Sequence, residues 1–142
     1  MTDPPAIPPA ASAAAGVGKL LPPGAGATLH LLGDVATTKV AANETAGGLS
    51  VVELATPVGG GVDEHVHPAN DETIYVLDGT FDVRVGASRE VLGAGGCAFA
   101  ARRTVHGFTN VGETAGRVLL ISSPATHAQR VWMEMAAGLR QP

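Results

Sequence analysis

The sequence holds one cysteine, Cys97, and only 4% of its 142 residues are aromatic and 15% charged. A single cysteine cannot form an internal disulfide, which favours a reducing compartment. The N-terminal stretch lacks the basic region of a secretory signal, so we expect a cytoplasmic protein. No apolar run reaches the ~18 residues that a membrane-spanning helix requires, and we expect no membrane partner.

Positive charge is also scarce. Nine lysine and arginine residues stand against 13 aspartate and glutamate residues, which gives a net charge of -4 and a pI near 5.6. A nucleic-acid-binding protein would carry a basic patch, and the chain has no basic cluster beyond Arg102-Arg103. We therefore expect no nucleic-acid partner, and a small molecule is the expected ligand.

The composition divides the chain into three parts. Residues 1–23 are rich in alanine, proline and glycine and have little to bury, so they predict a flexible arm. Residues 24–124 alternate short apolar stretches with glycine, asparagine and aspartate, which is typical of a single β-domain. Residues 125–142 predict a short helix that packs on this domain, because apolar side chains recur at helical spacing: Trp132, Met133, Met135, Ala136 and Leu139.

The central part contains eight strand-like segments, at residues 28–32, 36–41, 49–56, 73–77, 80–85, 97–100, 106–109 and 117–122. Short strands in this number and spacing fit an all-β jelly-roll sandwich. Asp78-Gly79 lies between two of the segments and is a dipeptide that the two-residue type I′ turn prefers. It predicts a β-hairpin at this point.

Three histidines provide the strongest chemical signal. His65 and His67 are separated by one residue, and on a strand such residues face the same side. His106 lies in a later strand-like segment. Imidazole nitrogen is the commonest side-chain ligand for transition metals, and a nearby carboxylate adds an oxygen ligand. The pattern predicts a metal site, and the alternative is a set of hydrogen-bonded histidines inside a sandwich.

Glu72 is the expected fourth ligand. Proline, asparagine and aspartate within residues 68–71 favour a turn, after which Glu72 returns on the next strand. Three imidazoles and one carboxylate leave open positions on an octahedral metal, which suits catalysis better than a purely structural role.

Three further side chains are candidates to line a substrate pocket. By alternation along their strands, Ile74 shares the face of Glu72, and Phe108 shares the face of His106. Arg102 precedes the second histidine segment and is a candidate cation for the pocket mouth.

These residues resemble the two sequence motifs of the cupin family. The first motif is a His-x-His pair followed by glutamate and flanked by glycines, and it is complete here: Gly59, His65, His67, Glu72 and Gly79. The second motif is matched at Gly95, His106 and Asn110, whereas Ala101 and Arg103 stand where proline and glycine are usual. The two departures fall on a turn and concern its shape, not the ligands. Segments 31–34 and 48–53 are more specifically similar to single-domain, quercetinase-like cupins.

The resemblance implies one divalent transition metal per chain, with iron, manganese, nickel, cobalt and zinc all open. It implies a dioxygenase acting on a small hydroxylated aromatic or enol compound, with Glu72 as a ligand or as the base that removes the hydroxyl proton. Two alternatives stay open. One is a redox-neutral, zinc-dependent cyclase, isomerase or lyase of the polyketide-pathway type. The other is a non-catalytic, small-molecule-binding cupin.

Two copies of the chain are expected to associate. A jelly roll leaves sheet edges whose unpaired N–H and C=O groups can pair with another strand. Segment 28–32 is apolar on both faces, which a solvated edge strand does not need. Since related cupins commonly dimerise through such sheets, the resemblance implies a homodimer.

Overall fold

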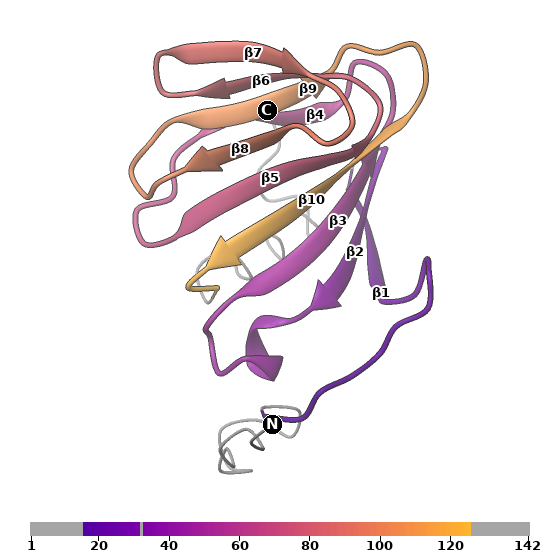
Figure 1. Cartoon of the computed structure of the whole chain (residues 1–142), viewed down its shortest axis with the longest axis vertical. Helices are drawn as coiled ribbons and strands as arrows, with labels where there is room; N and C mark the ends of the chain where they lie inside the picture. The colour runs from indigo at the N-terminus through magenta and orange to yellow at the C-terminus, as the bar shows by residue number, and fades with distance from the viewer. Residues whose placement is uncertain (1–15, 32, 126–142) are drawn as a thin grey trace.

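The computed structural model describes residues 16–31 and 33–125, which form two facing antiparallel sheets (Figure 1). The larger sheet has six strands in the order β1 (Ala27–Leu31), β2 (Asp34–Val40), β3 (Ser50–Thr56), β10 (Gly116–Ser123), β5 (Asp71–Asp78) and β8 (Cys97–Ala100). The smaller sheet has four strands in the order β4 (Gly61–His65), β9 (His106–Asn110), β6 (Phe81–Val85) and β7 (Ser88–Leu92). A single 3-10 turn, η1 (Ala42–Glu44), joins β2 to β3.

This arrangement confirms the predicted all-β jelly roll. All eight predicted strands are present, and β4 and β7 are additional. β7 is mostly exposed and contains an Arg-Glu pair, whereas β4 is partly buried and exposes its two acidic residues. They lie at the two edges of the smaller sheet, and neither shows the regular alternation of buried residues that marks central strands such as β3 and β10.

The predicted hairpin at Asp78-Gly79 is wrong. β5 and β6 flank this dipeptide, but they belong to different sheets. Both edges of β5 are already paired, with β10 and with β8, so β6 cannot join it there. The chain instead crosses between the layers at Gly79, whose φ is +94°. A Cβ at Gly79 would lie 2.9 Å from the Cα of Gly116, so glycine is required on two counts.

The core fills the space between the two sheets. Alternate residues of the central strands point inward and are less than 4% exposed, among them Leu54, Ile74, Val76, Phe81 and Val118. The rings of Phe81 and Phe108 meet edge to face with centroids 5.9 Å apart, a geometry worth about 0.5–1.5 kcal/mol beyond the buried area. Phe108, a candidate for the substrate pocket, thus also belongs to the hydrophobic core.

The proposed segment boundaries at 23 and 125 stay predictions. Residues 16–23 of the arm are mostly exposed, and Lys19 forms an ion pair of 2.7 Å with Glu44 of η1. The predicted C-terminal helix lies outside the described residues. Within the described part of the chain, no helix has the length and apolar character needed to cross a membrane.

A buried carboxylate at one end of the barrel makes stability depend on pH. Asp34 is 8% exposed and accepts a hydrogen bond from the Thr56 hydroxyl. Burial raises the pKa of Asp34 above its ordinary 3.8, and the hydrogen bond offsets only part of this effect. A raised pKa in the folded state means that the protonated carboxyl stabilises the fold, and that this contribution is lost as the pH rises through the folded pKa.

We therefore expect Asp34→Asn to be more stable than the wild type at neutral pH, because the amide keeps an acceptor for Thr56 without a buried charge. The difference should shrink as the pH falls toward 3.8. Thermal unfolding of both proteins across this pH range measures it. If the stability of the two proteins changed in parallel with pH, the raised pKa of Asp34 in the folded state would be contradicted.

Candidate metal centre

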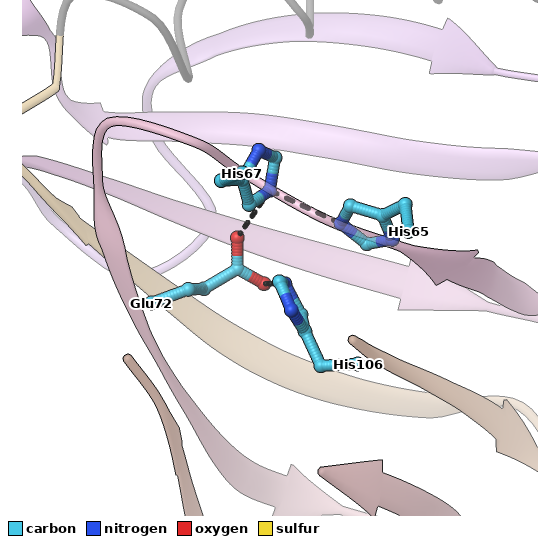
Figure 2. Close-up of side chains that lie close together, drawn as sticks. All are labelled: His65, His67, Glu72 and His106. Carbon is cyan, nitrogen blue, oxygen red and sulfur yellow. Dashed lines mark hydrogen bonds and ion pairs between the residues drawn. The ribbon is translucent and has the colours of Figure 1, made fainter. Parts of the chain in front are cut away.

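Four side chains predicted as metal ligands converge in the structure: His65, His67, Glu72 and His106 (Figure 2). Each offers one donor atom, and these atoms all lie within 4.8 Å of one another. His65 ends β4 and pairs in register with His106, which begins β9. Glu72 comes from β5 of the facing sheet. The site therefore connects the two layers.

The two histidines of the His-x-His pair do not share a strand. β4 ends at His65, and His67 lies in the connection that follows. Their rings nevertheless meet edge to face, with centroids 4.6 Å apart and an Nε2–Nε2 distance of 3.1 Å. The expectation of a common face on one strand is corrected, while the convergence that it predicted is present.

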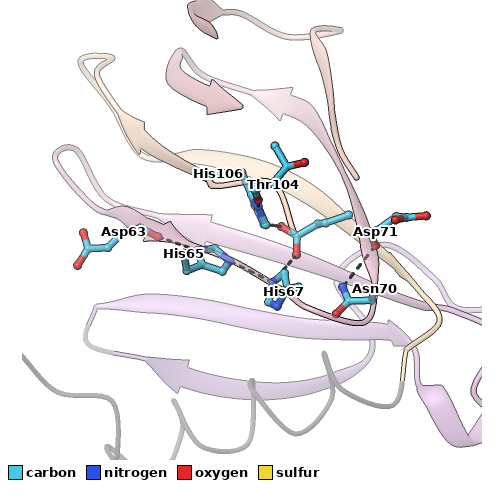
Figure 3. Close-up of polar contacts among 8 residues, drawn as sticks. Asp63, His65, His67, Asn70, Asp71, Thr104 and His106 are labelled. Atoms are coloured by element: carbon cyan, nitrogen blue, oxygen red, sulfur yellow. Dashed lines mark hydrogen bonds and ion pairs between the residues drawn. The ribbon is translucent and has the colours of Figure 1, made fainter. Parts of the chain in front are cut away.

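Backbone carbonyls fix the orientation of two imidazoles (Figure 3). His65 Nδ1 lies 2.7 Å from the carbonyl oxygen of Asp63, and His106 Nδ1 lies 2.9 Å from that of Thr104. A carbonyl only accepts, so each Nδ1 carries the proton and each Nε2 keeps its lone pair for the centre of the cluster. Such contacts hold the tautomer that a metal needs and raise the basicity of the ligand.

The Glu72 carboxylate lies between two histidines. One oxygen is 3.3 Å from His67 Nε2 and the other is 3.7 Å from His106 Nε2. Burial alone raises the pKa of Glu72, but interactions with His106 and His67 outweigh it and lower the pKa to about 2. The carboxylate is therefore charged at neutral pH, although the side chain is only 5% exposed.

The imidazoles respond in opposite directions. Burial lowers the pKa of His65, and the neighbouring His106 and His67 lower it further, although the Asp63 carbonyl acts against them. Burial also lowers the pKa of His106, but the Glu72 carboxylate and the Thr104 carbonyl prevail and raise it. The site thus combines a neutral imidazole with one that competes for a proton, as expected where a cation and a proton share the same lone pairs.

These donors fit a transition-metal ion. Three imidazole nitrogens and one carboxylate oxygen converge, and the buried His106 Nε2 forms no hydrogen bond of acceptable geometry with any residue that the structure describes. Lone pairs brought this close repel one another unless a proton or a cation lies between them. The donor set suits iron, manganese, nickel, cobalt or zinc alike and leaves two positions of an octahedron for other ligands.

The predicted pocket residues occupy different places. Ile74 is fully buried on the inward face of β5, next along from Glu72. Arg102 is bound instead to Asp71, with its Nε 3.1 Å from the carboxylate, and the Asp71 side chain points away from the histidines (Figure 3). The structure thus places Ile74 beneath the site and engages Arg102 in a surface ion pair.

The loop before β9 explains one departure from the second motif. Arg103, which stands where glycine is usual, has a φ of +69°. This left-handed conformation favours glycine, the residue that the motif usually has here, and arginine adopts it at some cost in strain. The Arg103 N–H donates a hydrogen bond of 2.8 Å to the carbonyl of His67, which connects the loop to the segment that carries two of the candidate ligands.

Sequence reasoning missed polar residues beside the ligands. Ser50 and Ser122 are 1% exposed and lie in the same cross-strand row as Glu72. Asn70, in the turn between His67 and Glu72, is equally buried. Alternation with inward-facing valine and leucine would have placed both serines on the core side of their strands, where a hydroxyl is unusual.

A family model described as "Cupin domain" matches residues 52–122, half of the chain. Among curated proteins, the tetracenomycin polyketide synthase protein TcmJ of Streptomyces glaucescens is 35% identical over 80 residues. The match covers 56% of this chain and 52% of that protein, so the chain spans about half the length of this relative.

Solved structures share the same architecture. KdgF from a Halomonas species superposes with a TM-score of 0.68 at 21% identity, covering 76% of this chain and 94% of that protein. An RmlC-like cupin from Shewanella frigidimarina superposes with a TM-score of 0.62 at 23% identity. The match covers 72% of this chain and 87% of that protein. At such identities the likeness shows the fold alone, and it is the jelly roll that the motifs predicted.

Proposed function

Because the chain belongs to the cupin family, we propose that it is a metal-dependent enzyme acting on a small phenolic or enolisable compound. One observation carries the proposal: three imidazoles and a carboxylate, from β4, the connection after it, β5 and β9, bring their donor atoms within 4.8 Å of one another. Such a donor set leaves metal positions open for a substrate. The similarity to a polyketide synthase protein supports the substrate class, since polyketide chains enolise readily and yield phenols.

Three groups of residues would have different roles: they would hold the metal, orient the histidine rings and exclude water. A divalent metal held by His65, His67, Glu72 and His106 would supply Lewis acidity and, with a redox-active ion, the capacity to activate dioxygen. The carbonyls of Asp63 and Thr104 keep two of the rings in the binding tautomer. The apolar layer that contains Ile74 lies directly beneath Glu72 and excludes water from that side of the site.

Two reactions follow from the same first event, the binding of a deprotonated substrate oxygen. Oxygenation is the reaction implied by the quercetinase-like sequence. A redox-neutral cyclisation, isomerisation or elimination is the alternative, and the similarity to TcmJ favours a polyketide-type substrate for it. Both require a transition metal, but only oxygenation consumes dioxygen.

Metal-loaded protein tests the proposal. Separate preparations with iron, manganese, nickel, cobalt and zinc are incubated with phenolic and β-diketone compounds, and oxygen uptake and products are measured. Uptake that depends on the metal supports oxygenation. Products formed equally well without oxygen and with zinc support the redox-neutral reaction. Saturable binding without any product would identify the non-catalytic alternative and reject the proposed enzyme.

We further propose that the protein is a homodimer. β1 is an edge strand of the larger sheet, and most of its side chains are exposed, including Leu29 and His30. Sedimentation velocity at micromolar concentration is expected to give twice the chain mass, and Leu29→Lys is expected to shift the protein toward monomer. A monomeric wild type would contradict the proposal. The predicted cytoplasmic location stays a prediction.

A further inference from the structure

Two serines occupy the row of inward-facing side chains that contains Glu72. Ser50 of β3 lies opposite Ser122 of β10, and Ser122 lies opposite Glu72 of β5. Side chains paired in this way have Cβ atoms about 4.5–5.5 Å apart. Ser122 is therefore the immediate neighbour of the carboxylate on this face, and Ser50 lies one strand farther, on the order of 10 Å from Glu72 across two strand spacings.

The polarity of this row is local. The next inward-facing row along the same three strands consists of Val52, Leu120 and Ile74, all of them 3% exposed or less. Hydroxyl groups thus lie at the level of the metal ligands, and the apolar core begins directly beneath them. Alanine at either serine would have extended that core to the site.

The Ser50 hydroxyl oxygen is buried, and no residue in the described part of the chain forms a hydrogen bond with it. Burying a hydroxyl without a partner is unfavourable, because its hydrogen bonds to water are lost and not replaced. Buried polar groups of this kind are exceptional, and a bound ligand is one of the explanations. Ser50 lies on the inner face of the larger sheet, in the same cross-strand row as Ser122 and Glu72.

On the basis of the proposed function, we infer that Ser50 and Ser122 form the hydrogen-bonding side of the substrate pocket. They bind a second oxygen of the substrate, a hydroxyl or a carbonyl, while the first oxygen lies at the metal centre. The spacing from Glu72 to Ser50 then selects planar compounds of about two fused rings with an oxygen at each end. Ser50, the farther of the two, determines this preference.

The test uses Co²⁺-loaded protein and two probes. One is the naphthalenediol with a hydroxyl at each end of its long axis, and the other is the naphthol that lacks the distal hydroxyl. Dissociation constants are measured from the visible absorption of Co²⁺. The wild type is expected to bind the diol about tenfold more tightly, the effect of one hydrogen bond. Ser50→Ala should remove that advantage and leave naphthol binding unchanged.

Controls separate this outcome from a general disturbance. Ser88→Ala removes an exposed hydroxyl on β7 of the smaller sheet and should leave both constants unchanged. Ser122→Ala provides a second variant in case Ser50→Ala folds poorly. Without ligand, Ser50→Ala should unfold at the same temperature as the wild type or higher, since the lost hydroxyl had no partner in the protein.

Equal binding of both probes by the wild type would overturn the inference, as would a Ser50→Ala protein that keeps the preference for the diol. If the protein does not bind Co²⁺, the same comparison is made from the thermal shift that each probe causes in the unloaded protein. Failure of the proposed function has a different signature, because an absence of turnover with a retained preference for the diol rejects catalysis but not the pocket.

Discussion

Replacement of His106 by alanine is expected to abolish stoichiometric metal binding. Its ring is 2% exposed, its Nδ1 is held by a backbone carbonyl, and within residues 16–31 and 33–125 its Nε2 has no hydrogen bond of acceptable geometry. Even the outer partners of metal ligands contribute about 10- to 100-fold to affinity, so the loss of a ligand should cost more than this range. His65→Ala should behave in the same way.

Elemental analysis of dialysed protein and titration with Co²⁺ measure the effect. The wild type should carry close to one divalent metal per chain. His30→Ala is the matched control, since His30 is an exposed histidine on β1. It should keep the metal content of the wild type. A His106→Ala protein with unchanged metal content would end the metal hypothesis.

The sequence predicted which side chains converge better than it predicted the path of the chain. The spacing of His65, His67 and Glu72 predicted that these side chains converge, and they do so although β4 ends at the first histidine. These side chains converge because the ends of β4 and β9 in the smaller sheet face β5 in the larger sheet. A hairpin at Asp78-Gly79 was the local preference of the dipeptide, but both edges of β5 were already occupied by strands distant in sequence. Such pairing cannot be inferred from the turn itself.

Two other features depend on tertiary context. Arg102 was a candidate for the pocket because it lies close to His106 in sequence, yet its own backbone N–H and its guanidinium both bind Asp71. Conversely, the sequence shows only that Ser50 is a polar residue within the strand-like segment 49–56. Only the register with β10 and β5 places it in the row of Glu72.

Glu72→Gln distinguishes a ligand from a base. The substitution removes the negative charge and keeps nearly the same shape. An efficient general base has a pKa near the working pH, whereas interactions with His106 and His67 hold the pKa of Glu72 at about 2 in the metal-free site. A carboxylate of this acidity is a weak base and a permanently charged cation ligand. This favours the ligand role over that of the base.

We therefore expect Glu72→Gln to lower metal affinity by about 10- to 100-fold and turnover in step with it, less than the loss of a whole ligand, because the amide oxygen remains as an uncharged donor. A base would behave differently, since the variant would keep its metal and lose about 10²–10⁴-fold in turnover. Titration with Co²⁺ and turnover at saturating metal separate the two outcomes. Glu53→Gln, which alters an outward-facing residue paired with Arg117, is the matched control and should change neither.

The pKa of His106 provides a second test of the Glu72→Gln variant, and this measurement needs neither metal nor substrate. The Glu72 carboxylate raises the pKa of His106, so the uncharged amide should lower that pKa. NMR titration of metal-free wild type and Glu72→Gln protein measures the change. A lowered His106 pKa together with weakened metal binding would establish Glu72 as the charge that holds the cluster together. Full metal content with unimpaired turnover would exclude Glu72 from both roles.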